Sequence, residues 1–223
     1  MTSHRKLRVT FFGDSICTGQ HVAIHQGWVT RTSLGLSKIM NSSLGEIVVT
    51  NSSVNGRTTR QALETMAYEL QSHSPEIVII QFGMNDCNYW ASDRGLPRVS
   101  RPSFSANLSE IIQRSFHYGA KRVFLNTNHP TTLTSHTFPH TETTYQSSNA
   151  DYNKAIRNVA ESSGATLNDV ENHFLALIDQ NEVKLSDMLL PEDQLHLSSI
   201  GHDAYYSFIY PKIEESIICL LDD

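Results

Sequence analysis

Five short apolar segments alternate with segments of helical spacing along the 223-residue chain, and this alternation limits the possible folds more than any other feature. Most of the five are near-continuous runs of Val, Ile, Leu and Phe, as in parallel strands that are buried on both faces. The predicted strands are 7–12, 46–51, 76–82, 122–127 and 165–170. This repeated alternation of strands and helices predicts a doubly wound α/β sheet.

Four helices are expected between and after these strands. Thr58 and Gln61 have the spacing of a capping box at the start of the first helix, while Gly119 and Gly164 stand where the next two should end. Pro211 is expected to kink or break the last helix, because proline removes a backbone donor and clashes with the preceding turn. The expected helices cover 58–70, 103–119, 147–164 and 199–217.

Composition favours one domain over residues 1–223 and argues against several classes of protein. A formal net charge of -6 argues against a nucleic-acid partner, which would call for a basic surface. The three cysteines Cys17, Cys87 and Cys219 form no Cys-x-x-Cys pair, so neither a zinc site nor a disulfide framework is indicated. With no apolar stretch near the roughly 20 residues of a membrane span and no signal-peptide core, we expect a cytoplasmic protein without a membrane anchor.

Two long connections, 87–102 and 129–146, interrupt the regular alternation. Long loops in compact domains are usually functional or mobile. In an open α/β sheet the ligand crevice lies beyond the carboxyl ends of the strands, and both loops leave the sheet at those ends. The same edge is therefore the predicted place of the functional site.

Four small motifs with reactive or polar side chains follow the strands or lie near the C-terminus. "GDSI" contributes Ser15, "NSSVNGRT" contributes Gly56, "QFGMND" contributes Asn85, and "PEDQLHLSSIGH" contributes Asp193 and His196. The chain has no Gly-x-Ser-x-Gly elbow, Walker loop, Gly-x-Gly-x-x-Gly or His-Glu-x-x-His motif. The four motifs are thus the main guide to function.

Acyl transfer uses this set of residue types. A serine hydroxyl is a weak nucleophile until an imidazole takes its proton, and the imidazole needs a carboxylate to fix its tautomer. Asp193 precedes His196 by three residues, a spacing that one turn can close and that favours it over Glu192 and Asp203. Hydrogen-bond donors must also surround the oxyanion of the tetrahedral intermediate, and we expect the backbone N–H groups of Ser15 and Gly56 and the Asn85 amide to supply them.

Each of these residues also has an ordinary structural interpretation. Ser15 could cap a helix, Gly56 could be a turn glycine, and Asn85 with Asp86 could form a turn or a cap. For Asp86 we favour a structural role in orienting its loop. His202 is expected to be a surface or packing residue of the last helix.

A metal site is not expected. His129, His136 and His140 share one loop, but the loop has no cysteine and only Glu142 as a further ligand, whereas zinc wants three or four ligands of fixed geometry. We expect His129 instead to line the substrate pocket. Trp90 lies with several arginines in the other long loop, where it could stack on a sugar. A solvated loop without such a role is the alternative.

Ser15, Gly56, Asn85 and His196 occur in the order of the four blocks that define the SGNH hydrolase superfamily, also called GDSL esterases and lipases, and the chain resembles that family. "GMND" matches the family's third block and "DQLHLSSIGH" resembles its ending, so the likeness extends from residue 9 to about residue 205. Ile16 departs from the Leu of the family's nickname, a conservative apolar exchange. The resemblance implies a flavodoxin-like three-layer α/β/α sandwich with a five-stranded parallel sheet, and metal-free, cofactor-free hydrolysis of esters or thioesters.

The sequence therefore predicts a serine ester hydrolase for small soluble esters such as O-acetylated sugars. A lysophospholipase or thioesterase, or an acyltransferase using the same residues, remains an alternative. A non-catalytic α/β binding module is a further one, although the complete residue set argues against it. The acyl chain, the alcohol and the oligomeric state stay open.

Overall fold

The computed structural model describes residues 5–39 and 45–222 and confirms the predicted α/β fold. Five parallel strands form one sheet in the order β2-β1-β3-β4-β5. The strands are β1 (Arg5–Gly13), β2 (Gly45–Asn51), β3 (Ile77–Gln81), β4 (Arg122–Asn126) and β5 (Thr166–Asn168). The helices are α1 (Ser15–Thr18), α2 (Trp28–Leu36), α3 (Thr59–Glu69), α4 (Arg101–His117), α5 (Tyr145–Ser163), α6 (Val170–Asp179), α7 (Leu185–Met188) and α8 (Ser199–Asp222), with short 3-10 turns at Ile24–Gln26, Gln71–His73 and Ala91–Asp93.

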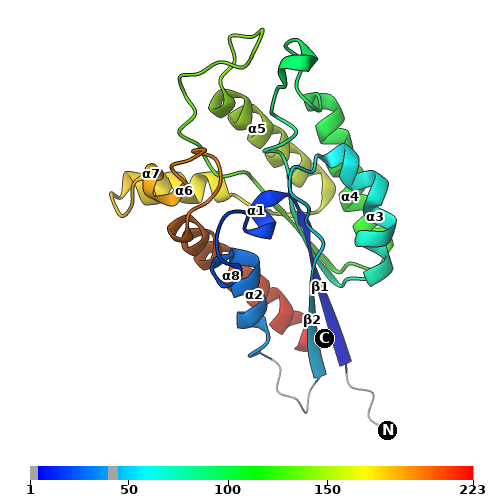
Figure 1. Ribbon diagram of the computed structural model, residues 1–223. Helices are drawn as coiled ribbons and strands as arrows, with labels where there is room; N and C mark the ends of the chain where they lie inside the picture. Colours follow the sequence, from blue (N-terminus) through cyan, green and yellow to red (C-terminus); the bar gives the residue numbers. More distant parts are fainter. Residues whose placement is uncertain (1–4, 40–44, 223) are drawn as a thin grey trace.

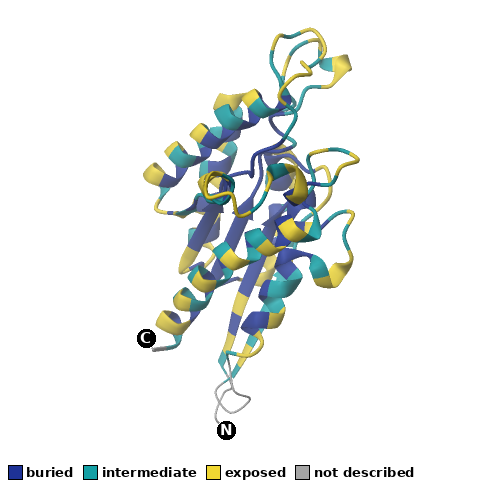
Figure 2. Cartoon of the chain, turned by 90° about the vertical axis from the view of Figure 1, so that its left-hand side faces the viewer, coloured by how far each residue is buried: buried dark blue, intermediate teal, exposed yellow. Residues whose placement is uncertain are grey.

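Helices cover both faces of the sheet, as the apolar strands require. Figure 1 shows α2 and α8 on one face and α3, α4 and α5 on the other. The strand segments in the middle of the sheet are buried, while the helices turn exposed residues outward (Figure 2). The central strand β3 is buried at every position, which explains its unbroken apolar sequence.

The strand order reverses between β1 and β3. From β1 the chain first adds β2 on one side and then crosses to add β3, β4 and β5 on the other. At such a switch point the loops leaving the two central strands diverge and open a crevice beyond their carboxyl ends. Ser15 follows β1 and Asn85 follows β3, so both lie at this crevice.

The local signals for helix ends are confirmed. The Thr58 side chain accepts from the Gln61 N–H, and the Gln61 side chain accepts from the Thr58 N–H, which completes the capping box of α3. Gly164 ends α5 in the left-handed conformation, with φ of 79°.

Two expectations about helices need correction. The last helix is not broken at Pro211 and runs from Ser199 to Asp222. Ile209, Ile213 and Ile217 are fully buried on its inner face, and this packing outweighs the hydrogen bond that proline removes. Helices α2, α6 and α7 were not expected from the sequence. Within the described residues, no helix is both long and apolar enough to cross a membrane.

Candidate active site

A tight turn at the end of β1 places Ser15 at the start of the short helix α1. Asp14, and not Ser15, is the N-cap: its Oδ1 accepts from the Ile16 N–H at 3.0 Å. The helix ends after one turn at Gly19, which has φ of 70°. Because Asp14 takes over the capping, the hydroxyl of Ser15 is left available for another partner.

The turn is held by close packing beneath it. A Cβ at Gly13 would lie 2.6 Å from the Cys17 sulfur and 2.7 Å from the Gln81 carbonyl, so only glycine fits. The buried indole of Trp28 donates to the Ile16 carbonyl at 2.9 Å and anchors α1 from the side of α2. Ser15 itself is 5% exposed.

Ser15, His196 and Asp193 form a continuous chain of hydrogen bonds. The His196 Nε2 lies 2.9 Å from the Ser15 Oγ, although 181 positions separate the two residues in sequence. The His196 Nδ1 lies 2.6 Å from the Asp193 Oδ2. Because an ionised carboxylate can only accept, Nδ1 carries the proton of the neutral ring and Nε2 is free to accept the Ser15 proton.

Asp193 organises the loop that presents His196. Its Oδ1 accepts from the N–H groups of Leu195 and His196, both at 2.9 Å, while its Oδ2 takes the imidazole. Burial alone would raise the pKa of Asp193, but the backbone and side-chain hydrogen bonds from His196 and the Leu195 N–H lower it overall. The carboxylate therefore stays ionised beside the imidazole at neutral pH.

Gly56 lies in the connection that follows β2, and Asn85 lies in the connection that follows β3; both strands pair with β1. The Asn85 Nδ2 donates to the Asp14 Oδ2 at 3.3 Å, which ties the β3 connection to the residue before Ser15. Gly56 has φ of +75°, and a Cβ there would meet no heavy atom within 4 Å. The glycine is thus needed for its left-handed conformation, and not for the close approach of protein atoms.

Two buried carboxylates accompany these residues. Burial, with the neighbouring Asp86 charge adding to it, raises the pKa of Asp14 to about 7. Burial also raises the pKa of Asp86 to about 6, against hydrogen bonds from Thr59 and the charge of Arg98. The Asp86 Oδ1 accepts from the Thr59 N–H and hydroxyl at 2.9 and 2.6 Å, so Asp86 joins the β3 connection to α3.

His129 does not line a pocket, contrary to the sequence-based expectation. Its side chain is fully buried, and its Nε2 donates to the Leu195 carbonyl at 2.8 Å. Burial lowers its pKa to about 4, so the ring is neutral. His129 therefore supports the loop of His196 from the buried side, through its hydrogen bond to Leu195. Trp90, the other proposed substrate contact, is 52% exposed in the β3–α4 connection.

The remaining histidines divide between core and surface. His202 is buried in α8 and accepts from the Trp28 N–H, which agrees with a packing role. Among the described residues, the side chains that could hold a metal ion are His21, Asp193 and His196, whose ligand atoms lie within 4.8 Å of one another. A metal there would compete with the Ser15–His196–Asp193 hydrogen bonds. His129, His136 and His140, which share one loop, are not among these residues.

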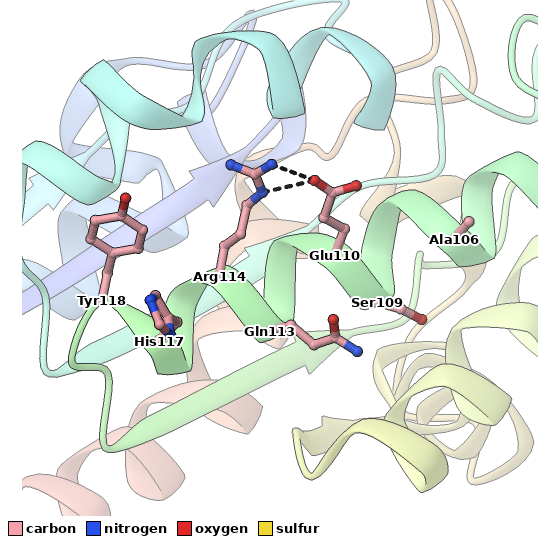
Figure 3. A pocket seen from close by; sticks show the side chains of 7 residues that line it. All are labelled: Ala106, Ser109, Glu110, Gln113, Arg114, His117 and Tyr118. Carbon is pink, nitrogen blue, oxygen red and sulfur yellow. Dashed lines mark hydrogen bonds and ion pairs between the residues drawn. The ribbon is translucent and has the colours of Figure 1, made fainter.

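Two hollows flank the site. One, of about 360 Å³, is lined by His21, Leu190, Glu192 and Asp193. The other, of about 410 Å³, begins at Val54, Asn55 and Gly56 and extends over polar residues of α3. A larger pocket of about 640 Å³ follows the outer side of α4, where Glu110 pairs with Arg114 (Figure 3), and shares no residue with the Ser15 site.

Two residues that contact the site, Asp14 and Arg98, have no role predicted from the sequence. Asp14 lies in the GDSI motif, which was singled out only for Ser15, although its second oxygen reaches Asn85. Arg98 was one of several arginines in a long loop, and its guanidinium bonds to both Gly56 and Asn85. Only its place in a connection leaving the sheet at the crevice could have singled it out.

Two curated relatives are similar in sequence to part of this chain. An arylesterase of Vibrio mimicus is 26% identical over 123 residues, which cover 55% of this chain and 56% of the relative. An uncharacterized lipoprotein, YqeF, of Bacillus subtilis (strain 168) is 27% identical over 122 residues, covering 52% and 46%. The chain thus matches about half the length of these relatives.

The solved structures match over nearly the whole chain. The acetylxylan esterase Axe2 of Geobacillus stearothermophilus superposes with a TM-score of 0.74 at 20% identity, over 93% of this chain and 94% of that one. A lipase/acylhydrolase of Enterococcus faecalis gives 0.71 at 22% identity, over 94% and 96%. These neighbours share the fold. The sequence pattern of the GDSL-like lipase/acylhydrolase family matches residues 11–204. As the four ordered motifs predicted, this chain belongs to the GDSL-like lipase/acylhydrolase family.

Proposed function

We propose that the protein is a serine ester hydrolase in which Ser15 is the nucleophile. His196 acts as the general base and Asp193 orients it and stabilises its charged form. The backbone N–H groups of Ser15 and Gly56 and the Asn85 Nδ2 form the oxyanion hole. The observation that carries the proposal is the 2.9 Å contact between the Ser15 Oγ and the His196 Nε2.

The reaction follows from this contact. The Ser15 oxygen bonds to the acyl carbon while its proton passes to the His196 Nε2, and the carbonyl electron pair moves onto the oxyanion. Collapse of the intermediate breaks the ester C–O bond, and His196 returns the proton to the leaving alcohol. Water then attacks the acyl-enzyme, giving its proton to His196, which passes it back to Ser15 as the acid leaves.

For the substrate we propose a small acyl group, such as acetyl, on a polar alcohol of the carbohydrate class. Most residues that line the hollow beginning at Val54, Asn55 and Gly56 carry polar or charged side chains, which suit the hydroxyl groups of a polar alcohol. The exposed ring of Trp90 offers a face on which a sugar could stack. The acetylxylan esterases that share the fold act on substrates of this kind and support the choice.

The test compares p-nitrophenyl acetate with its four-, eight- and sixteen-carbon homologues, and with acetylated xylo-oligosaccharides, for the wild type and Ser15→Ala. We expect turnover that is highest for acetyl and is lost in Ser15→Ala. Equal turnover by both proteins would overturn the proposal. Preference for long acyl chains or thioesters would instead indicate a lysophospholipase or thioesterase, and acyl transfer to an added sugar would indicate an acyltransferase.

A further inference from the structure

Arg98 connects the two strand-end motifs that flank Ser15. Its Nη1 donates to the Gly56 carbonyl at 3.2 Å and to the Asn85 Oδ1 at 3.3 Å, and its Nη2 donates to the same Gly56 carbonyl at 3.2 Å. Gly56 follows β2 and Asn85 follows β3, so one side chain spans the connections of two strands. The planar fork of a guanidinium can make this set of bonds, whereas a lysine ammonium is a single point of charge.

The contact with Asn85 determines which way the amide faces. A guanidinium has donors and no acceptor, so it requires the oxygen of the amide on its side. The Asp14 carboxylate, an acceptor when ionised, holds the Nδ2 at 3.3 Å on the other side. A flipped amide would set donor against donor and acceptor against acceptor. One N–H of the Asn85 Nδ2 donates to Asp14, and the second N–H is available as a donor to the oxyanion.

The contact with Gly56 restrains a turn whose glycine has more than one accessible conformation. The turn closes where the Arg57 N–H donates to the Val54 carbonyl at 3.2 Å, with Gly56 in the left-handed conformation. Glycine can rotate out of this conformation more readily than any other residue. Two donors from Arg98 on the Gly56 carbonyl hold the peptide plane that follows Gly56. They thereby oppose rotation about the φ and ψ of the glycine, which relate this plane to the one that carries its N–H.

Arg98 is itself held in place by its own connection. Its guanidinium lies over the ring of Trp90, 4.2 Å from the ring centroid. Its backbone N–H donates to the Asn88 carbonyl at 2.9 Å, and the next residue, Val99, donates to the Asp86 carbonyl at 3.2 Å. The indole ring thus holds the guanidinium, and the backbone hydrogen bonds hold the segment that carries Arg98.

We propose that Arg98 is a positioning residue that sets the Gly56 N–H and the Asn85 amide in the orientation needed to receive the oxyanion. This inference rests on the proposed esterase function, since it assigns an orienting partner to the two donors of that site. Trp90 acts in it as the ring on which Arg98 stacks. A simple structural anchor in a surface loop would stabilise the fold without changing the turnover of folded molecules.

The test uses Arg98→Met and Arg98→Lys, with Arg101→Met as the matched control. Arg101 lies three residues further on, pairs with Asp151 at 3.8 Å, and is 60% exposed. With p-nitrophenyl acetate we expect Arg98→Met to lower kcat about tenfold to hundredfold with KM within about twofold, somewhat less than loss of an oxyanion donor itself. Arg98→Lys should recover only part of the loss. Arg101→Met should match the wild type.

Two further measurements separate positioning from anchoring. In a double-mutant cycle, the loss of kcat in Arg98→Met combined with Asn85→Ala should be smaller than the product of the two separate losses, because Arg98 then has only the Gly56 N–H left to orient. In NMR spectra, the side-chain amide signals of Asn85 should shift or broaden in Arg98→Met and stay in place in Arg101→Met. Multiplying kinetic losses, an unchanged kcat in Arg98→Met, or unchanged Asn85 amide signals would overturn the inference.

The NMR measurement does not depend on catalysis. If Ser15→Ala hydrolyses the ester as fast as the wild type, the proposed function fails, while the Asn85 signals still decide whether Arg98 orients the amide. If Ser15→Ala is inactive and Arg98→Met retains the wild-type kcat, the esterase proposal stands and the role of Arg98 is rejected.

Discussion

The Asp14 carboxylate bonds to Asn85 through one oxygen and caps the helix of Ser15 through the other. Its Oδ2 accepts from the Asn85 Nδ2 at 3.3 Å and its Oδ1 from the Ile16 N–H at 3.0 Å. The Asp14 side chain thereby joins the segments that follow β1 and β3, the two strands at the switch point. Any change at Asp14 acts on the serine helix and on the Asn85 amide together.

Asp14→Asn should lower kcat for p-nitrophenyl acetate about tenfold to hundredfold. Asparagine has a single oxygen, which can cap Ile16 or accept from Asn85 but cannot do both, and its amide nitrogen would then face a second donor. Folding should persist, because asparagine is also a good N-cap. Steady-state kinetics, with Asp151→Asn as a surface control, check this. A wild-type kcat in Asp14→Asn would show that the link to Asn85 is not needed.

The strands and helix ends that could be predicted are those marked by residues close together in the sequence. The strands and the capping box of α3 are visible as apolar runs and as a Thr-x-x-Gln pattern. Helix α2 was missed because its burial depends on distant partners: a Cβ at Gly35 would lie 2.4 Å from the ring of Tyr210 in α8. The helix continues past Pro211 because Ile209, Ile213 and Ile217 pack into the core, a contact that the local sequence does not show.

The site shows the same division. Ser15, Asp193 and His196 could be proposed because the chemistry of acyl transfer requires these residue types and the chain holds them in ordered motifs. His129 was placed wrongly, since no local pattern tells whether a histidine after a strand turns toward the crevice or under a loop. The role of Arg98 depends on how a long irregular connection folds back, which has no periodic signal.

Asp193→Asn should lower kcat by about 10²- to 10⁴-fold while the protein stays folded. The asparagine oxygen can still accept from the Leu195 and His196 N–H groups, but its amide nitrogen would face the His196 Nδ1 and favour the wrong tautomer. Asp203→Asn, a change at an exposed carboxylate paired with Arg31, is the control. Should Asp193→Asn keep more than a tenth of the wild-type kcat, Asp193 would not be the orienting group.

His129→Leu should destabilise the protein by about 1–3 kcal/mol and lower kcat without raising KM. The change removes the donor to the Leu195 carbonyl, so the loop that presents His196 loses a support. His129→Gln, which offers a donor of similar reach, should recover part of both effects. Urea unfolding and steady-state kinetics measure them. A raised KM at unchanged kcat would instead restore the earlier idea that His129 contacts substrate.

Asp86→Asn should change the pH dependence of stability because it removes a buried charge. Burial raises the pKa of Asp86 from an ordinary value of 3.8 to about 6 in the folded protein. The folded state therefore binds more protons than the unfolded state between these values, and stability is lost as pH rises from about 4 through about 6. Two pKa units correspond to about 3 kcal/mol at most.

The variant keeps the local hydrogen bonds, so the pH effect can be isolated. Its oxygen can still accept from the Thr59 N–H and hydroxyl, and its amide nitrogen takes the place of Oδ2, which has no hydrogen-bond partner among the described residues. The nitrogen without a hydrogen-bond partner lowers the stability of the variant by the same amount at every pH. The neutral histidines His129 and His202 contribute equally in both proteins. Neither contribution therefore changes how the difference in stability between the two proteins depends on pH. Removing the Asp86 charge also relieves Asp14, which strengthens the effect in the same direction. Urea unfolding at pH 4 and at pH 7.5 should therefore show Asp86→Asn gaining about 2–3 kcal/mol relative to the wild type at the higher pH. A difference between the two proteins that stays constant with pH would mean that Asp86 is ionised at pH 4 or is not buried as a charge at all.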